Sequence, residues 1–174
     1  LARQIELGAE ADLFVSADRT WIEYLAGQGF RSPPEAIARN ELVVWAQKGE
    51  QPLEGRGELE RRRWRRIAVG DEAVPVGRYA RAALQGLALE DRFVSCRDAP
   101  SVLRTLETGE VDAGIAYLTD GQDLEGLQVI WRFGATPEVS YWALRLNDGP
   151  ESKLLLEALR GEAARELFEA RGFR

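Results

Sequence analysis

The feature that most restricts the fold is a regular alternation of short apolar segments with helical segments in the middle of the chain. The apolar segments have the length of buried strands, and the segments between them place apolar side chains at helical spacing. Strands that alternate with helices form largely parallel sheets with crossover helices, so we predict an α/β fold. The strands are expected at residues 67–70, 92–94 and 113–117, and the helices at residues 76–89 and 100–107.

Elements of the same two kinds flank this region on both sides. Leu1 and Ile5 lie one turn apart in a helical pattern, and Asp18 is expected to cap a second helix. Pro33 and Pro34 break the chain, and we expect a short helical turn after them. The remaining strands are expected at residues 11–16, 42–46, 127–133 and 138–146, and two C-terminal helices at residues 151–160 and 162–171.

Composition argues against several classes of protein. The net charge of −6, from 23 basic and 29 acidic residues, argues against a surface that binds nucleic acid. Residues 58–66 form the strongest charge run, with five arginines around Trp64, and we expect a solvated helical face there. The chain has no His, and Cys96 belongs to no familiar nucleophile motif. We therefore expect no enzymatic activity, no cofactor and no directly coordinated metal.

Three places combine a strand with groups that can bind a ligand. After one strand a helix begins at Pro75, and the first N–H groups of a helix lack intrahelical partners, so Val76 can donate to an anion. Gly77 would let such a ligand approach the backbone. Residues 113–120 form a strand that ends in a polar turn, and Tyr141 lies in an apolar strand. An ordinary proline-initiated helix, a buried strand and a core tyrosine ring stay open as interpretations of the same residues.

Taken together and in order, five stretches of the chain resemble the periplasmic molybdate-binding protein family of ABC importers. They include the run Val-Pro-Val-Gly-Arg-Tyr-Ala and the run Gly-Ile-Ala-Tyr, and the resemblance covers essentially the whole chain. The stretches are residues 1–6 with 8–9 and 11–17, residues 42–44, residues 69–71 with 74–80, residues 106–117 with 119–120, and residues 167–168 with 172–173.

This resemblance implies the type II periplasmic-binding-protein fold, in which two α/β lobes are joined by two hinge crossings and the ligand lies in the cleft between the lobes. The first lobe would consist of residues 1–43 and 144–174, and the second lobe of residues 48–138. Residues 44–47 and 139–143 would be the hinge crossings. Because the chain begins with leucine and contains no Met, we expect the first lobe to be incomplete at its N-terminus and an export signal to precede the chain.

Carried over residue by residue, the resemblance implies three donors to a bound oxyanion. They are the backbone N–H groups of Val76 and Ala116 and the hydroxyl of Tyr141. The family usually has the smaller alanine at the position of Val76, and proline is frequent at the position of Trp142. The family's other donors, which are serines, would precede this chain. Molybdenum would be present only as molybdate at these residues, without a cation coordinated directly by the protein.

The function implied is that of an extracytoplasmic receptor, periplasmic or at the cell surface, which delivers molybdate, and also tungstate, to the membrane permease of an ABC importer. We expect such a receptor to be a monomer. A site that offers only donors favours a fully deprotonated tetrahedral dianion, because protonated phosphate would leave a buried hydrogen without an acceptor at a cost of ~1–3 kcal/mol. Two alternatives stay open: an oxyanion-sensing or small-molecule-sensing domain of a transcription regulator, and a sulfate-type anion receptor.

Overall fold

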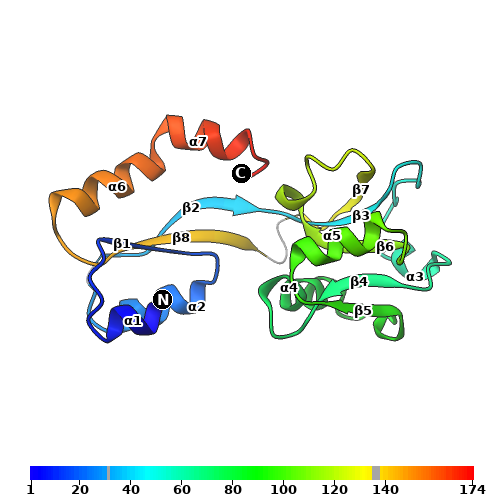
Figure 1. Ribbon diagram of the computed structural model, residues 1–174, viewed down its shortest axis with the longest axis horizontal. Coiled ribbons are helices and arrows are strands. Elements are labelled where there is room, and N and C mark those ends of the chain that lie inside the picture. The colour runs from blue at the N-terminus through cyan, green and yellow to red at the C-terminus, as the bar shows by residue number, and fades with distance from the viewer. Residues whose placement is uncertain (31, 135–137) are drawn as a thin grey trace. The chain divides into compact units, whose positions relative to one another are not determined.

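The computed structural model consists of two compact units (Figure 1). The structure describes the chain except at residue 31 and residues 135–137. Unit 1 is built from the two ends of the chain, and unit 2 from one continuous segment between them. Unit 1 comprises Leu1–Asn40 and Ser140–Arg174, and unit 2 comprises Glu41–Val139.

Unit 2 is built on a five-stranded sheet with the strand order β5-β4-β6-β3-β7. β4 pairs in parallel with β5 and β6, whereas β3 pairs antiparallel with β6 and β7. Four strands therefore run in one direction and β3 runs against them, as the prediction of a largely parallel sheet requires. The strands are β3 (Leu42–Gln47), β4 (Ile67–Gly70), β5 (Phe93–Cys96), β6 (Ala113–Tyr117) and β7 (Leu127–Arg132).

Two helices of unit 2 cross over between its parallel strands. α4 follows β4, and α5 follows β5 (Figure 1). α4 ends at Leu84 rather than at the expected residue 89, because Gly86 turns the chain with a φ of +85°. The charge run forms only one helical turn, so the expected helical face over residues 58–66 was wrong. The helices are α3 (Glu58–Arg61), α4 (Pro75–Leu84) and α5 (Ala99–Glu107), with short 3₁₀ turns η1 (Glu90–Arg92) and η2 (Leu118–Asp120).

The core of unit 2 lies between this sheet and its helices. All four residues of β4 are buried, and so are the first five residues of β3. α4 and α5 contribute their apolar faces to the same core, namely Ala80, Ala83, Leu84, Val102, Leu103 and Leu106. Because a close-packed interior leaves little freedom of movement, the strand ends from which the two helices start are held firmly in place.

Unit 1 contains a three-stranded sheet with the order β1-β8-β2, in which β1 pairs antiparallel with β8. The helical turn expected after Pro33 and Pro34 was wrong, because strand β2 follows them. Arg39 of β2 and Arg174 are joined by two backbone hydrogen bonds, of 2.6 and 2.8 Å. Pairing with residues far away in the sequence therefore makes this segment a strand rather than a helical turn. The elements are α1 (Ala2–Glu6), β1 (Leu13–Ser16), α2 (Arg19–Gly27), β2 (Glu35–Asn40), β8 (Val139–Arg145), α6 (Pro150–Arg160) and α7 (Glu162–Glu169).

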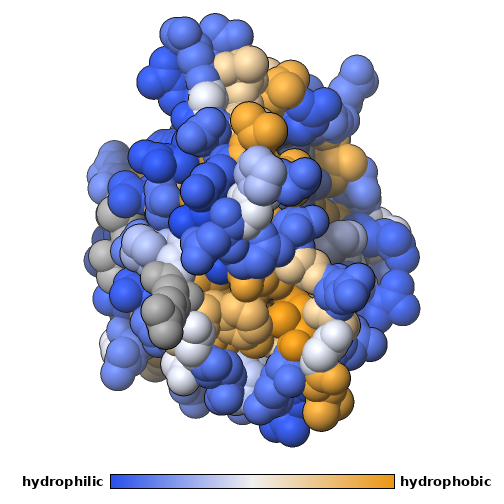
Figure 2. Space-filling view, turned by 90° about the vertical axis from the view of Figure 1, so that its left-hand side faces the viewer, coloured by the Kyte–Doolittle hydropathy of each residue, from blue (hydrophilic) through white to orange (hydrophobic). Residues whose placement is uncertain are grey.

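The core of unit 1 is small, and apolar side chains remain on its surface. Its buried cluster consists of Ala2, Phe14, Ile22, Leu25 and Leu144. A groove of about 520 Å³ lies beside edge strand β1, and Figure 2, which faces unit 1, shows apolar atoms gathered among hydrophilic ones. The groove is lined by Leu1, Ala2, Arg3, Phe14, Val15, Ser16, Ala17 and Trp21.

The chain passes between the units at residues 40–41 and at residues 139–140. The sequence-based hinge crossings, residues 44–47 and 139–143, lie in β3 and in β8. Their role as hinges, and the lobe boundaries that go with them, stay predictions. None of the helices among the described residues has both the length and the apolar character that crossing a bilayer requires.

Candidate functional site

Three strands of unit 2 end together at one edge of the sheet. β4 and β5 pair in parallel up to Gly70 and Cys96, and β6 runs parallel to β4 on its other side. The chain continues from β4 toward α4 and from β5 toward α5, so both helices start at this edge. Because ligands of open α/β sheets gather at the carboxyl ends of strands, this edge is the candidate site.

In the first turn of α4, one backbone N–H group has no recorded hydrogen-bond acceptor among the described residues. Pro75 occupies the first position and has no N–H, as the sequence predicts. The N–H groups of Gly77 and Arg78 both donate to the Val74 carbonyl, at 3.1 and 3.2 Å. Val76 has no recorded acceptor for its N–H among the described residues. Its N–H therefore stays available where the positive end of the helix dipole lies.

The first turn of α5 repeats this arrangement one residue earlier. The Asp98 carboxylate caps the helix by accepting from the Ser101 N–H at 2.8 Å, and the Asp98 carbonyl accepts from the Val102 N–H at 3.2 Å. Since Pro100 has no N–H, Ala99 carries the remaining donor, and the part of the chain described here shows no acceptor for it. Sequence reasoning missed Ala99, although an aspartate two residues before a proline signals such a helix start.

A pair of glycines allows the strand end to approach the helix start. A Cβ atom on Gly77 would lie 2.0 Å from the Asp71 carbonyl oxygen and 2.4 Å from that of Gly70. A Cβ atom on Gly70 would lie 2.6 Å from Cγ1 of Val76 and 2.7 Å from the Gly77 nitrogen. The expectation that Gly77 makes room for a ligand therefore needs correction, because the chain itself occupies that space.

Polar contacts fix the loop between β4 and α4. The Asp71 carboxylate accepts from the Ala73 N–H at 2.9 Å and from the Ser95 hydroxyl at 3.1 Å, and these bonds lower the pKa of Asp71. Hydrogen bonds from the Ser101 side chain and backbone likewise lower the pKa of Asp98. Nη1 of Arg81 donates to the Gly70 carbonyl at 2.8 Å. Both helix starts are thus held by ionised carboxylates and need little reorganisation to receive a ligand.

The N–H of Ala116 points across the sheet toward β3. Ala116 pairs with Val43 in the antiparallel register, and two residues further on the Leu118 N–H donates to the Glu41 carbonyl at 2.8 Å. Because N–H groups two residues apart in a strand point to the same side, the Ala116 N–H faces Val43. The role of Ala116 as a ligand donor stays a prediction, although this pairing directs its N–H into the sheet.

Tyr117, the last residue of β6, is half-buried at the candidate edge. Its ring packs edge-to-face on Tyr79 of α4, with 6.4 Å between the centroids. Its carbonyl accepts from Nε1 of Trp45 at 3.3 Å, and its backbone N–H donates to the Asp120 carboxylate. Tyr117 therefore brings a phenol to the edge where α4 and α5 start. The sequence singles out this strand end but not this residue.

Tyr141 belongs to β8 and to unit 1, whereas Val76 and Ala116 belong to unit 2. Its ring packs edge-to-face on Phe173 at 5.3 Å, and Phe173 packs on Phe168 at 5.8 Å. The neighbouring Trp142 does not disturb the strand, because β8 pairs with β1 in unbroken register from this residue to Arg145. The hydroxyl role of Tyr141 stays a prediction.

The surroundings of Cys96 and the placement of possible metal ligands bear on whether the described residues could catalyse a reaction through a thiol or a metal ion. Cys96 is buried, and this burial raises the pKa of its thiol, which works against a nucleophilic thiolate. The described residues contain no group of three or more His, Cys, Asp or Glu side chains placed to hold a metal ion. What the candidate edge offers is therefore a set of hydrogen-bond donors.

Comparison with known proteins places the chain among binding proteins. Residues 1–174 match the family of bacterial extracellular solute-binding proteins. The molybdate-binding protein ModA of Escherichia coli K12 is 33% identical over 193 residues, which cover 99% of this chain and 74% of that protein. The substrate-binding domain assigned to a molybdenum ABC transporter of Clostridium difficile superposes with a TM-score of 0.88 at 25% identity, over 99% of this chain and 80% of that one.

A second solved structure agrees in fold. The periplasmic molybdate-binding protein of Azotobacter vinelandii superposes with a TM-score of 0.73 at 22% identity, over 99% of this chain and 82% of that one. These matches confirm the type II periplasmic-binding-protein fold expected from the sequence.

Proposed function

Because the chain belongs to the bacterial extracellular solute-binding protein family, we propose that it is a receptor that binds molybdate outside the cytoplasm and delivers it to an ABC importer. The name of the Escherichia coli relative, a molybdate-binding protein, supports this choice of ligand. The periplasm or the cell surface is the proposed location, and the permease of the importer is the proposed membrane partner.

One observation carries this proposal. α4 and α5 start from neighbouring parallel strands, and each offers one backbone N–H without a recorded acceptor among the described residues. Two helix starts at one sheet edge add their positive dipole ends at the same place. The buried side chains of Val76 and Ala99 hold these two donors in position. Such an arrangement suits a small anion with several acceptor oxygens, even in a protein of net charge −6.

The donor set also supports selectivity for a fully deprotonated dianion. Backbone N–H groups donate and cannot accept, so the hydrogen of a protonated oxyanion would have no partner at Val76 or Ala99, at a cost of ~1–3 kcal/mol. Molybdate, tungstate and sulfate carry no such hydrogen near neutral pH, whereas phosphate does. We therefore propose molybdate and tungstate as ligands and discrimination against phosphate.

Residues of both units take part in the proposed mechanism. Unit 2 supplies Val76 and Ala99 through their N–H groups and Tyr117 through its phenol, and Tyr141 of unit 1 supplies a hydroxyl. Ala116 stays in the proposal as a further donor, a role that would require its N–H to turn from β3 to the ligand. Ligand binding would shift the receptor toward the state that the permease recognises. The receptor acts as a monomer in this scheme.

An NMR titration with molybdate tests the proposal at the level of single donors. Backbone amide spectra of the 174-residue chain are recorded with increasing sodium molybdate, and separately with sulfate and phosphate. Molybdate should shift the amide signals of Val76 and Ala99 before those of the rest of unit 2, because these N–H groups would gain a charged acceptor. Phosphate should shift them less at equal concentration.

A matched pair of variants at one position isolates the donor. Ala99→Pro removes the N–H at a helix position that tolerates proline, whereas Ala99→Gly keeps it. Ala99→Pro should weaken molybdate binding by about tenfold, the size of one hydrogen bond to a charged group, and Ala99→Gly should leave it nearly unchanged. Equal binding by the two variants, or molybdate shifts that leave the amide signals of Val76 and Ala99 in place, would contradict the proposed site.

A further inference from the structure

Four exposed arginines lie close together in the sequence, from the last residue of α3 to the residue before β4. They are Arg61, Arg63, Arg65 and Arg66, called here the arginine patch. All four residues are exposed, and within the described ranges their guanidinium groups have no recorded carboxylate partner. The chain carries a net charge of −6, so the residues outside this +4 patch sum to −10. The patch is a local positive field on a negative protein.

The backbone that carries the patch is fixed to the core. Trp64, in the middle of the run, is buried. The Asp112 carboxylate accepts from the backbone N–H groups of Arg65 and Arg66, at 2.7 and 3.0 Å. On the other side of Trp64, Nη1 of Arg92 donates to the carbonyls of Glu60 and Arg62, at 3.3 and 3.2 Å. The exposed side chains therefore project from a preorganised segment, which reduces the entropy lost when they bind.

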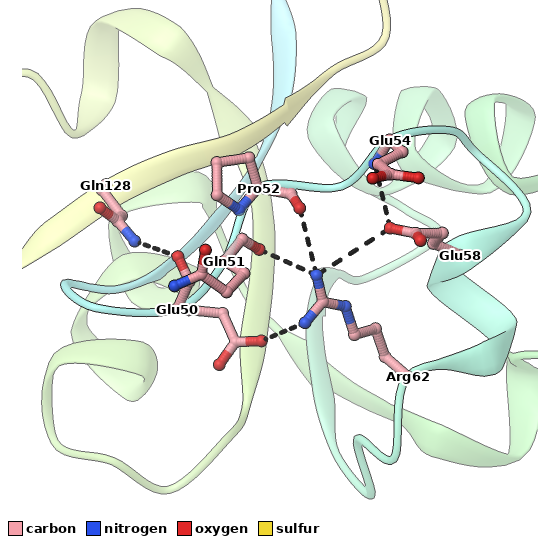
Figure 3. A network of polar contacts seen from close by, with 7 residues as sticks. All are labelled: Glu50, Gln51, Pro52, Glu54, Glu58, Arg62 and Gln128. Atoms are coloured by element: carbon pink, nitrogen blue, oxygen red, sulfur yellow. Dashed lines mark hydrogen bonds and ion pairs between the residues drawn. The ribbon is translucent and has the colours of Figure 1, made fainter.

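The fifth arginine of the run, Arg62, anchors the segment (Figure 3). Its Nη1 lies 3.0 Å from the Glu50 carboxylate, and its Nη2 donates to the carbonyls of Gln51 and Pro52, at 3.0 and 3.2 Å. Nη2 also lies 3.9 Å from the Glu58 carboxylate. Arg62 thus pairs with the carboxylates of Glu50 and Glu58, which are therefore not paired with the arginine patch.

The arginine patch is distinct from the candidate anion site. Arg65 and Arg66 directly precede β4, whereas Gly70 ends that strand next to the start of α4. The patch and the backbone donor of Val76 therefore lie at opposite ends of β4. A ligand at one of them leaves the other free.

We propose that the arginine patch binds the phosphate groups of anionic phospholipids and so holds the receptor at the membrane surface. Both apolar residues of the run, Leu59 and Trp64, are buried, so the patch has no apolar anchor for a dry protein–protein interface and nothing to insert into a bilayer. Clustered basic side chains bind anionic membranes electrostatically, by about fivefold per residue near the surface. The proposal rests on the extracellular character of the family and is independent of molybdate.

Vesicle co-sedimentation tests the lipid interaction. The chain should bind phosphatidylglycerol vesicles at low ionic strength, release them at high ionic strength, and not bind phosphatidylcholine vesicles. Replacing the arginine patch with glutamine, as R61Q/R63Q/R65Q/R66Q, should reduce binding at least about tenfold. The matched control R3Q/R104Q/R165Q/R171Q changes the net charge equally at scattered exposed positions and should reduce binding far less.

Further outcomes distinguish a lipid contact from an effect of net charge and from a protein contact. Equal losses in the two quadruple variants would overturn the proposal, because net charge alone would then account for binding, and so would an absence of binding to phosphatidylglycerol. Replacing the four arginines with lysine should preserve vesicle binding, since the charge is retained. A protein contact would give a different result. The chain would then bind permease reconstituted in phosphatidylcholine, and this binding would disappear when the four arginines are replaced with lysine. Each variant is also titrated with molybdate. A loss of vesicle binding with unchanged molybdate binding concerns the lipid proposal alone, whereas a lack of molybdate binding by the unsubstituted chain concerns the proposed function.

Discussion

Units 1 and 2 differ in how the chain builds them and in how completely they bury their apolar residues. Unit 2 is continuous and surrounds β4, which is buried along its whole length. Unit 1 joins two distant segments, has a buried cluster of five residues, and exposes 88% of Leu1 and 41% of Trp21. The helix donors of Val76 and Ala99, which have no recorded acceptor among the described residues, belong to the unit with the deeper core. Rigid positioning of donors and tight packing therefore occur together in this protein.

This contrast predicts that the units unfold separately, and four changes test it. The largest effect is expected from Gly77→Ala in unit 2. The added Cβ would meet two backbone oxygens at 2.0 and 2.4 Å, so the strand end and helix start must move apart. We expect a loss of at least about 5 kcal/mol in the free energy of unfolding of unit 2, measured by urea titration. Gly126→Ala, where a Cβ meets nothing within 4 Å, is the control and should change little.

Truncation of one core side chain in each unit sharpens the comparison. Ile115 in β6 and Ile22 in α2 are both fully buried. Each substitution to alanine should cost about 2–5 kcal/mol and should move only the transition of its own unit. The cost of Ile22→Ala should lie at the lower end of this range, because the smaller core of unit 1 can relax around the cavity. A single transition that shifts as a whole in both variants would refute independent unfolding.

A smaller effect is expected from acid. Asp71 and Asp98 have pKa values lowered by hydrogen bonds, so their stabilising contribution is complete above the ordinary carboxyl pKa of about 4. It is lost as the pH falls through the lower pKa values of the folded state. The urea concentration at the unfolding midpoint of unit 2 should therefore decrease when the pH is lowered below ~4. Asp98→Asn keeps a capping side chain that does not titrate, so its midpoint should depend less on pH over this range.

The smallest change in stability is expected at the surface of unit 1. Trp21 contributes to the apolar groove and packs edge-to-face on Tyr24 at 5.8 Å. Trp21→Ser should change the stability of unit 1 by no more than about 1 kcal/mol while it reduces binding of a hydrophobic dye. Trp64→Ser is the contrast in unit 2, since Trp64 is buried and its loss should destabilise that unit strongly. Unchanged dye binding by Trp21→Ser would show that the groove is not the dye site.

Sequence patterns predict the elements that are decided locally. Val43 and Val44 belong to an apolar run that fits a buried strand, and Asp18 caps α2 through the Thr20 N–H as expected. Strand β2 has no such run, because its pairing is supplied by β8 and by the C-terminal Arg174. No local pattern contains that information.

In the candidate site, too, local sequence predicts some residues, whereas others depend on contacts between distant segments. Val76 is found from sequence because Pro75 marks a helix start, and the structure leaves that N–H with no acceptor in the described chain. The direction of the Ala116 N–H depends on the register between β6 and β3, which a single sequence does not reveal. Asp98 before Pro100 marks the start of α5 in the sequence, but only the contacts show that the Ser101 and Val102 N–H groups donate to Asp98 and that the Ala99 N–H is left over among the described residues.

The discontinuous construction of unit 1 imposes an order on folding when the chain emerges from its amino end. β1 finds its partner β8 only after all of unit 2 has appeared, a delay of about 100 residues, or roughly 5–20 s at usual rates of synthesis. During this interval Phe14 and Ile22 lack Leu144, with which they later form a buried cluster. Residues 1–40 therefore lack these partners while unit 2 can already fold, and residues 140–174 supply the second segment of unit 1.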